Sequence, residues 1–205
     1  MLEAIVAWDE RTFRLINGDW HAPLFDVLFP WVTHWKNFVI PFLLLALVAI
    51  AVGRWRGLRF VLLALVSVLV ADAISARLVK TLVVRPRPCI TLEEVERVRL
   101  LVGCTTSSSF PSNHAVNASV LTTLVALYAR PLLLPASIVA MLVLYSRVYV
   151  GVHYPLDVLA GSLLGIAVAL ALSWLITAMS RYLPMWQEAP SHGRRRIYTL
   201  KIRDR

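Results

Sequence analysis

Three short segments hold the residues that could do chemistry, and each lies where an apolar run begins or ends. The first, KTLVVRPRP, carries Lys80, Arg85 and Arg87. The second is PSNH at residues 111–114, and the third is SRVYVGVHYPLD at residues 146–157. Together they supply several cations, two histidines and a carboxylate. Because ionisable groups at membrane depth are energetically costly, their presence at these positions predicts a functional site.

The residue types favour phosphate chemistry. Arginine binds phosphate oxygens in a planar, bidentate manner, lysine acts as a point charge, and a helix amino terminus adds N–H donors. A histidine backed by a carboxylate, here His153 and Asp157, is an oriented base or nucleophile. A second histidine, His114, can protonate a leaving oxygen. Metal binding is the rival use, but neighbouring cations would repel a divalent ion, so no metal or other cofactor is predicted.

Each residue also has an ordinary structural use when it is taken alone. Lys80 and Arg87 could anchor a helix end at the membrane surface. Ser112 could cap a helix, and Asp157 could complement a helix dipole. A lone His114 would more often be a satisfied interfacial histidine. The interpretation as a site therefore depends on all of these residues meeting at one membrane face.

The composition indicates a membrane protein. Of 205 residues, 59% are hydrophobic and only 16% are charged, and the mean hydropathy is +0.70. Soluble domains contain roughly 45–50% apolar and about 25% charged residues. In so apolar a chain, the net charge of +9 indicates cations facing a membrane surface, not a nucleic acid. The sequence does not indicate an oligomeric state.

The predicted fold class is all-α, an integral membrane bundle of about five, or even six, transmembrane helices. The apolar runs show no strand-like alternation, and backbone polar groups in lipid must be satisfied within a helix. About 20 apolar residues cross the hydrocarbon core. The predicted spans are Val32–Val52, Phe60–Val79, Ala115–Ala129, Leu132–Gly151 and Val158–Met179.

The spans divide the chain into three parts. Residues 1–31 are predicted to be an amphipathic segment in the membrane interface, 32–179 the transmembrane domain, and 180–205 a basic cytoplasmic tail. Lys and Arg number 11 on the tail side and 6 on the other, once Lys80, Arg87 and Arg147 are set aside as site residues. The positive-inside rule then places the tail in the cytoplasm and the long loop, residues 80–114, outside.

Some further residues carry expectations of their own. Cys89 and Cys104 lie in the outer loop, where either a disulfide or two free thiols would suit the sequence. Asp72 and Arg77, inside the second span, are expected to pair structurally or to line a cleft. Gly161 and Gly165 form a GxxxG pair that is expected to be a helix packing face within the bundle. Arg85 is expected to touch a second phosphate or to anchor the headgroup region.

The three segments resemble the signature of the type 2 phosphatidic acid phosphatase superfamily: K-x6-R-P, P-S-G-H and S-R-x5-H-x3-D. In this sequence they begin at Lys80, Pro111 and Ser146, with the same order and spacing. One position departs, because Asn113 stands where the family usually has glycine. The required donor there is a backbone N–H, which asparagine keeps, and asparagine tolerates unusual backbone angles better than most residues.

The resemblance implies a metal-independent membrane phosphatase built from a helical bundle. It implies His153 as the nucleophile that forms a phosphohistidine, Asp157 as the residue that orients it, and His114 as the acid for the leaving group. It also implies a set of groups that hold the phosphoryl oxygens: Lys80, Arg87, Ser112, the Asn113 N–H and Arg147.

The expected substrate is a lipid phosphate in the bilayer, with undecaprenyl (polyprenyl) diphosphate favoured. An outward site, a short chain and a small outer loop suit the recycling of a carrier lipid, which would place the protein in a bacterial inner membrane. Phosphatidylglycerophosphate and phosphatidate are alternatives. A transporter, or a lipid-binding sensor without catalysis, is a further alternative. The charges lie at one face rather than along a midplane path, and both histidines and the aspartate are present, which disfavours both.

Overall fold

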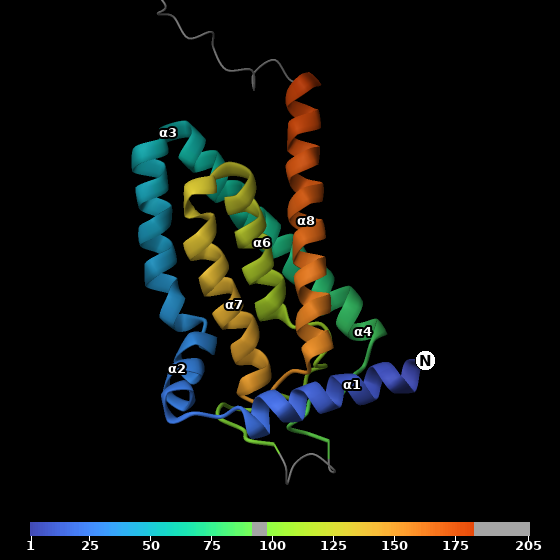
Figure 1. Cartoon of the computed structure of the whole chain (residues 1–205). Coiled ribbons are helices and arrows are strands. Elements are labelled where there is room, and N and C mark those ends of the chain that lie inside the picture. The colour runs from blue at the N-terminus through green and yellow to red at the C-terminus, as the bar shows by residue number, and fades with distance from the viewer. Residues whose placement is uncertain (92–97, 183–205) are drawn as a thin grey trace, which may run out of the picture. The chain divides into compact units, whose positions relative to one another are not determined.

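The computed structural model describes residues 1–91 and 98–182, and these residues form helices and loops with no β-strand (Figure 1). The predicted all-α class is confirmed. Most of the predicted basic tail, residues 183–205, lies outside the described residues, as does the loop segment 92–97. The elements are α1 (Leu2–Arg14), η1 (Leu15–Asp19), α2 (Pro23–Thr33), α3 (Lys36–Ala73), η2 (Ile74–Val79), α4 (Lys80–Leu82), α6 (Asn113–Tyr128), η3 (Arg130–Leu132), α7 (Leu133–Tyr149) and α8 (Pro155–Tyr182).

Within the described residues, three helical stretches are long and apolar enough to cross a membrane: 36–82, 130–149 and 155–179. The first consists of two arms, because the chain turns back at Arg54 (φ 50°, ψ −124°) near the end of the bundle (Figure 1). Each of the five predicted runs therefore forms a helix or one arm. α6, with 16 residues, is shorter than the roughly 20 that span the hydrocarbon core.

One predicted boundary is wrong. The first span begins at Lys36 and not at Val32, because α2 continues through Thr33 and a short break separates it from α3. Thr33 therefore ends a helix of the amino-terminal region, where its backbone carbonyl and side chain are not used by the next helix. Both groups turn out to contact site residues.

Large apolar side chains cover the outside of the helices. Val52 is 81% exposed and Leu134 is 72% exposed, and many other large apolar side chains along α3, α7 and α8 are also exposed. A soluble monomer rarely exposes contiguous apolar surface of this extent, whereas lipid tails accept it at no cost. The chain is thus a membrane protein whose polar groups face inward or lie at the ends of the helices.

The core of the bundle lies between the second arm of α3, α6 and α8. Its buried residues include Ala71, Val120 and Ala169. Gly161 and Gly165 of α8 face α6, and a Cβ added at Gly161 would lie 2.6 Å from the Ser112 carbonyl oxygen. The GxxxG pair is therefore a close packing face within the bundle, as predicted, and it brings the start of α8 against the start of α6.

The amino-terminal helices pack on the end of the bundle that carries the three motif segments. Phe13 of α1 is buried against Val148 and Tyr154. Phe29 of α2 is buried against Tyr149, the last residue of α7, and against Val150 and Val152 after it. These contacts place two helices beside the predicted site.

Candidate active site

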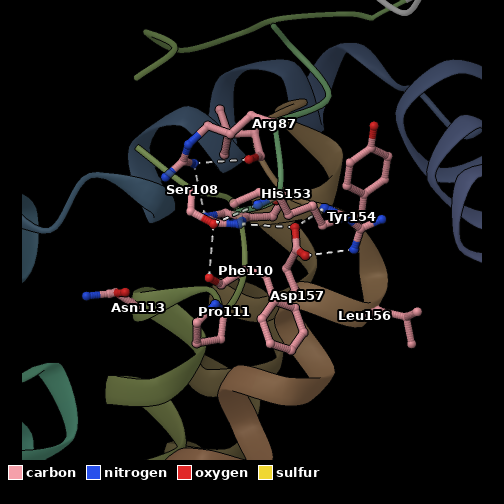
Figure 2. A network of polar contacts seen from close by, with 12 residues as sticks. Arg87, Ser108, Phe110, Pro111, Asn113, His153, Tyr154, Leu156 and Asp157 are labelled. Atoms are coloured by element: carbon pink, nitrogen blue, oxygen red, sulfur yellow. Dashed lines mark hydrogen bonds and ion pairs between the residues drawn. The ribbon is translucent and has the colours of Figure 1, made fainter. Parts of the chain in front are cut away.

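The three motif segments meet at one end of the bundle. Lys80 begins α4, which continues from α3 through η2, and Arg87 lies in the loop that follows α4. Residues 112–114 begin α6, and Arg147 lies in the last turn of α7. His153 and Asp157 flank the start of α8, and Figure 2 shows them beside Arg87.

His153 is held between an arginine and a carboxylate. Its Nε2 lies 3.2 Å from Arg87 Nη1, and its Nδ1 lies 3.5 Å from Asp157 Oδ2 (Figure 2). A guanidinium offers only N–H donors, so Nε2 carries the lone pair and Nδ1 carries the proton that faces the carboxylate. The 3.5 Å separation is longer than a well-formed hydrogen bond, and Nδ1 has no closer partner among the described residues.

The His153 imidazole is neutral near pH 7. Its side chain is almost fully buried, and burial lowers its pKa to about 4, with Arg147 and Arg87 lowering it further and Asp157 opposing the shift. A neutral imidazole with its lone pair on Nε2 is the form that can attack phosphorus.

Arg87 is fixed by contacts within the long loop between α4 and α6 and by the Val152 carbonyl. Its Nε donates to the Ser107 carbonyl at 2.9 Å, Nη2 donates to Ser107 Oγ at 3.1 Å, and Nη1 donates to the Val152 carbonyl at 3.1 Å. A disulfide joins Cys89 to Cys104, which settles the choice that the sequence left open. Because Cys89 follows Arg87 and Cys104 precedes Ser107, the disulfide holds the two parts of the loop that contact each other through Arg87.

Lys80 and Ser112 lie where the loop enters α6. Lys80 Nζ donates to the carbonyls of Ser108 and Pro111 at 2.7 and 2.9 Å. The Ser112 N–H donates to the Asp157 carbonyl at 3.0 Å. The Ser112 hydroxyl is fully buried and finds no hydrogen-bond partner within the described residues. Since buried polar groups are normally paired, this hydroxyl is a strong candidate ligand contact.

His114 and Arg147 converge on Thr33 at the end of α2. His114 Nε2 lies 3.1 Å from the Thr33 carbonyl, so that nitrogen carries a proton. Arg147 Nη1 donates to Thr33 Oγ1, whereas its buried Nε has no partner in the described part of the chain. One residue outside the motifs thus orients a candidate acid and a candidate phosphate-binding cation.

Asn113 turns its side chain away from the rest of the site. Its Nδ2 donates to Asp72 Oδ1 at 3.1 Å, its Oδ1 accepts from Ser75 Oγ at 2.8 Å, and Figure 2 shows it pointing away from His153. Asn117 also donates to Asp72, at 3.3 Å. No ion pair joins Asp72 to Arg77 in the described residues, so Asp72 serves the start of α6 and the expected pairing is wrong.

Sequence reasoning missed Asp9 and expected a different role for Arg85, as a contact to a second phosphate or a headgroup anchor. Arg85 donates to Asp157 Oδ1 at 2.8 Å and to Asp9 Oδ2 at 2.6 Å, so its guanidinium is already engaged by two carboxylates. Burial raises the pKa of Asp9, while the hydrogen bonds from Arg85 and the Leu156 N–H oppose that rise. The signal for Arg85 was its place in the first motif segment, but Asp9 is a single acidic residue in an amphipathic helix and carries no signal of its own.

The donor set suits an anion better than a metal ion. Among residues 1–91 and 98–182, no group of three or more His, Cys, Asp or Glu side chains is placed to hold a metal. The acidic side chains near His153 are already bound to Arg85 and to backbone N–H groups. Arginine and lysine donors around a buried hydroxyl instead match the oxygens of a phosphoryl group.

Several curated proteins with similar sequences are lipid phosphatases by name. The undecaprenyl-diphosphatase of Sulfolobus acidocaldarius is 32% identical over 165 residues, which are 80% of this chain and 76% of that protein. The decaprenylphosphoryl-5-phosphoribose phosphatase of Mycobacterium tuberculosis is 38% identical over 138 residues, 67% of this chain and 72% of that one.

A solved structure and a family model extend the similarity to the fold. A transmembrane PAP2-type phosphatidylglycerolphosphate phosphatase from Bacillus subtilis matches with a TM-score of 0.63 at 25% identity, over 88% of this chain and 90% of that one. The model described as the PAP2 superfamily matches residues 60–181, more than half of the sequence and all three motif segments. The chain therefore belongs to the PAP2 superfamily and is a membrane hydrolase that acts on lipid phosphates.

Proposed function

We propose that the protein removes the terminal phosphate of a polyprenyl diphosphate, undecaprenyl diphosphate above all, through a phosphohistidine at His153. The observation that carries this proposal is the arrangement of His153 itself. Arg87 lies at its Nε2 lone pair and Asp157 faces its Nδ1–H. This is the geometry of a nucleophile that is oriented on one side and directed at an anion on the other.

In the first step, His153 Nε2 attacks the terminal phosphorus, and the bond from phosphorus to the lipid-side oxygen breaks. Asp157 supports the positive charge that develops on the imidazole. Arg87 shifts its contact from Nε2 to a phosphoryl oxygen, and Arg147, Lys80, the Ser112 hydroxyl and the Asn113 N–H bind the others. Burial lowers the pKa of His114 to about 3 in the free protein, but the negative charge of the bound phosphate favours the imidazolium, whose Nδ1–H supplies a proton to the leaving oxygen where that oxygen requires one.

In the second step, water attacks the phosphorus, the P–N bond breaks and inorganic phosphate leaves. His114, now unprotonated, takes the proton from the attacking water, as microscopic reversibility requires. The His153 imidazole regains its lone pair at Nε2. The protein returns to its starting protonation state without a redox partner or a cofactor.

The substrate assignment is supported by the relatives and by the membrane setting. Two curated relatives act on polyprenyl-linked phosphates by name, and the solved neighbour acts on phosphatidylglycerolphosphate. Phosphatidylglycerolphosphate is therefore the second candidate. The site lies at a helix end beside an apolar exterior, where a lipid headgroup meets water.

A substrate panel in detergent tests the proposal. We expect the purified protein to release phosphate from undecaprenyl diphosphate with a higher kcat/KM than from phosphatidylglycerolphosphate or phosphatidate. We also expect the rate to persist in EDTA, because cations of the chain itself neutralise the phosphoryl charge. A rate lost in EDTA and restored by Mg²⁺ or Zn²⁺ would contradict the metal-independent mechanism, and a preference for either glycerolipid would reassign the substrate.

We further propose that the site faces the outside of a bacterial inner membrane and that the tail is cytoplasmic. The loop 98–112 and the α6–α7 turn lie at opposite ends of the bundle (Figure 1). In a background with both cysteines replaced by serine, we expect Thr106→Cys to react with an impermeant thiol reagent in intact cells. Arg130→Cys should react only after permeabilisation. Both positions are exposed, so the reverse pattern would invert the proposed orientation.

A further inference from the structure

Two carboxylates from distant parts of the chain share one guanidinium behind the candidate nucleophile. Arg85 Nη1 donates to Asp157 Oδ1 at 2.8 Å, and Nη2 donates to Asp9 Oδ2 at 2.6 Å. Asp9 and Asp157 are fully buried, and the Arg85 side chain is 22% exposed. Asp9 belongs to α1, which lies outside the residues that match the family model.

The remaining carboxylate oxygens are bound to the start of α8. Asp9 Oδ1 accepts from the Leu156 N–H at 2.8 Å, and Asp157 Oδ2 accepts from the Tyr154 N–H at 2.9 Å. The Arg85 guanidinium also lies 4.0 Å from the centre of the Tyr154 ring. Each oxygen of both carboxylates therefore has a partner, and rotation of either carboxylate would break contacts on both sides.

We propose that Asp9 and Arg85 are positioning residues for catalysis, which orient Asp157 toward His153 and set the charge that His153 experiences. The proposal rests on the phosphatase mechanism given above. Arg85 holds Oδ1 of Asp157, which leaves Oδ2 facing His153 Nδ1 at 3.5 Å. Asp9 neutralises the Arg85 guanidinium. The negative charge of Asp157 is therefore not cancelled by Arg85 and can stabilise a positive charge on the His153 imidazole.

Attachment of α1 alone does not require this arrangement. Phe13 of α1 is already buried against Tyr154, with ring centroids 5.3 Å apart, and apolar contacts of this kind hold helices together without desolvating charge. A buried ion pair costs several kcal/mol per ion in desolvation and is often no more stabilising than apolar packing. Two buried carboxylates around one arginine are thus better explained by the charge and geometry they give to Asp157.

The pH dependence of turnover distinguishes a positioning role from a structural one. The charged and titratable groups around His153 are Asp157 from α8, Arg87 from the outer loop, Arg147 from α7 and His114 from α6. Removing the charge of Asp9 leaves Arg85 to neutralise Asp157 alone. Asp157 then stabilises the imidazolium less, so His153 is a weaker nucleophile and protonates at a lower pH.

Asp9→Asn tests the proposal, with Glu10→Gln as its matched control. Glu10 lies next to Asp9 on α1 but pairs with Arg14 at the surface, so its loss removes a carboxylate from the same helix without touching the site. Partners that orient a directly acting group typically contribute about 10- to 100-fold. We expect Asp9→Asn to lower kcat by about tenfold, to leave KM nearly unchanged, and to move the acidic limb of the rate profile to lower pH. Glu10→Gln should change none of these.

A double-mutant cycle with Asp157→Asn closes the test. If Asp9 acts through Asp157, Asp9→Asn should have no more than about a twofold further effect in the Asp157→Asn protein. Arg85→Lys, which keeps the charge but cannot bridge two carboxylates, should lower kcat in the same way, and thermal unfolding should confirm that each variant is folded.

Three results would overturn the positioning role. They are an undiminished kcat in Asp9→Asn, an unmoved acidic limb, and an equal loss in the presence and absence of the Asp157 carboxylate. Wild-type turnover by Asp157→Asn itself would be a different failure. It would remove the proposed phosphohistidine mechanism, and the role of Asp9 with it.

Discussion

Replacing His153 with glutamine is expected to lower kcat by at least about a thousandfold, because removal of a nucleophile leaves only binding and electrostatic stabilisation. Glutamine keeps a polar side chain of similar length in the buried position between Arg87 and Asp157, but it has no lone-pair nitrogen to attack phosphorus. Phosphate release from undecaprenyl diphosphate measures the effect. Residual turnover of more than about one per cent would remove His153 from the role of nucleophile.

The same protein offers a control and a direct test for the intermediate. His34 is exposed after the end of α2, and His34→Gln should leave kcat unchanged. Wild-type protein quenched during turnover of a ³²P-labelled substrate should carry label that is stable in base and lost in acid, as expected for a P–N bond. His153→Gln should carry none.

The acidic limb of wild-type activity follows from the state of His153. Burial lowers the pKa of this imidazole to about 4, and only the neutral form is a nucleophile. As the pH rises through that value the imidazole loses its proton, so the free protein gains its reactive form well below the ordinary histidine range. The rate profile should therefore not show an ordinary histidine limb from His153 near pH 6.5.

Replacing His114 with asparagine should have an effect that depends on the leaving group. A general acid contributes about 10²- to 10⁴-fold when the leaving oxygen is strongly basic. For phosphatidate, whose leaving group is an alcohol, we expect kcat to fall by about a hundredfold or more. For p-nitrophenyl phosphate the leaving phenolate needs no proton, and the loss should be small. A diphosphate, whose leaving group is a phosphate ester with a second pKa of about 6, should also show only a small loss.

The contact of His114 with Thr33 supplies the control for this comparison. Thr33→Val removes the hydroxyl that binds Arg147 but keeps the carbonyl that binds His114. We expect this variant to weaken phosphate binding by a similar factor for every substrate, without dependence on the leaving group. Equal losses on all substrates for His114→Asn would place His114 among the phosphate-binding residues and remove it as the acid.

The local features of this protein are readable in its sequence. Apolar runs of about 20 residues in a chain with few charges leave the helix as the only way to satisfy the backbone in lipid. The ends of the helices are less readable. The first span was predicted to begin at Val32, but Val32 belongs to α2 and the span begins at Lys36. The candidate residues in the three motifs were predicted from their types, which suit phosphate, and from an order and spacing that resemble the signature of one phosphatase superfamily.

Tertiary structure decided which partners these residues have. Asp9 and Arg85 are 76 positions apart, and Thr33 and Arg147 are 114 apart, so no local pattern links them. Such contacts arise only when α1 and α2 pack their apolar faces, through Phe13 and Phe29, on the end of the bundle. Asn113 is a further example. The resemblance implied a role for its backbone N–H, but its side-chain partners, Asp72 on α3 and Ser75 on η2, depend on how closely the helices approach. Residue type and spacing thus predicted which groups the candidate site contains. The packing of distant helices determined how each group is held, because contacts between segments far apart in the sequence set its orientation.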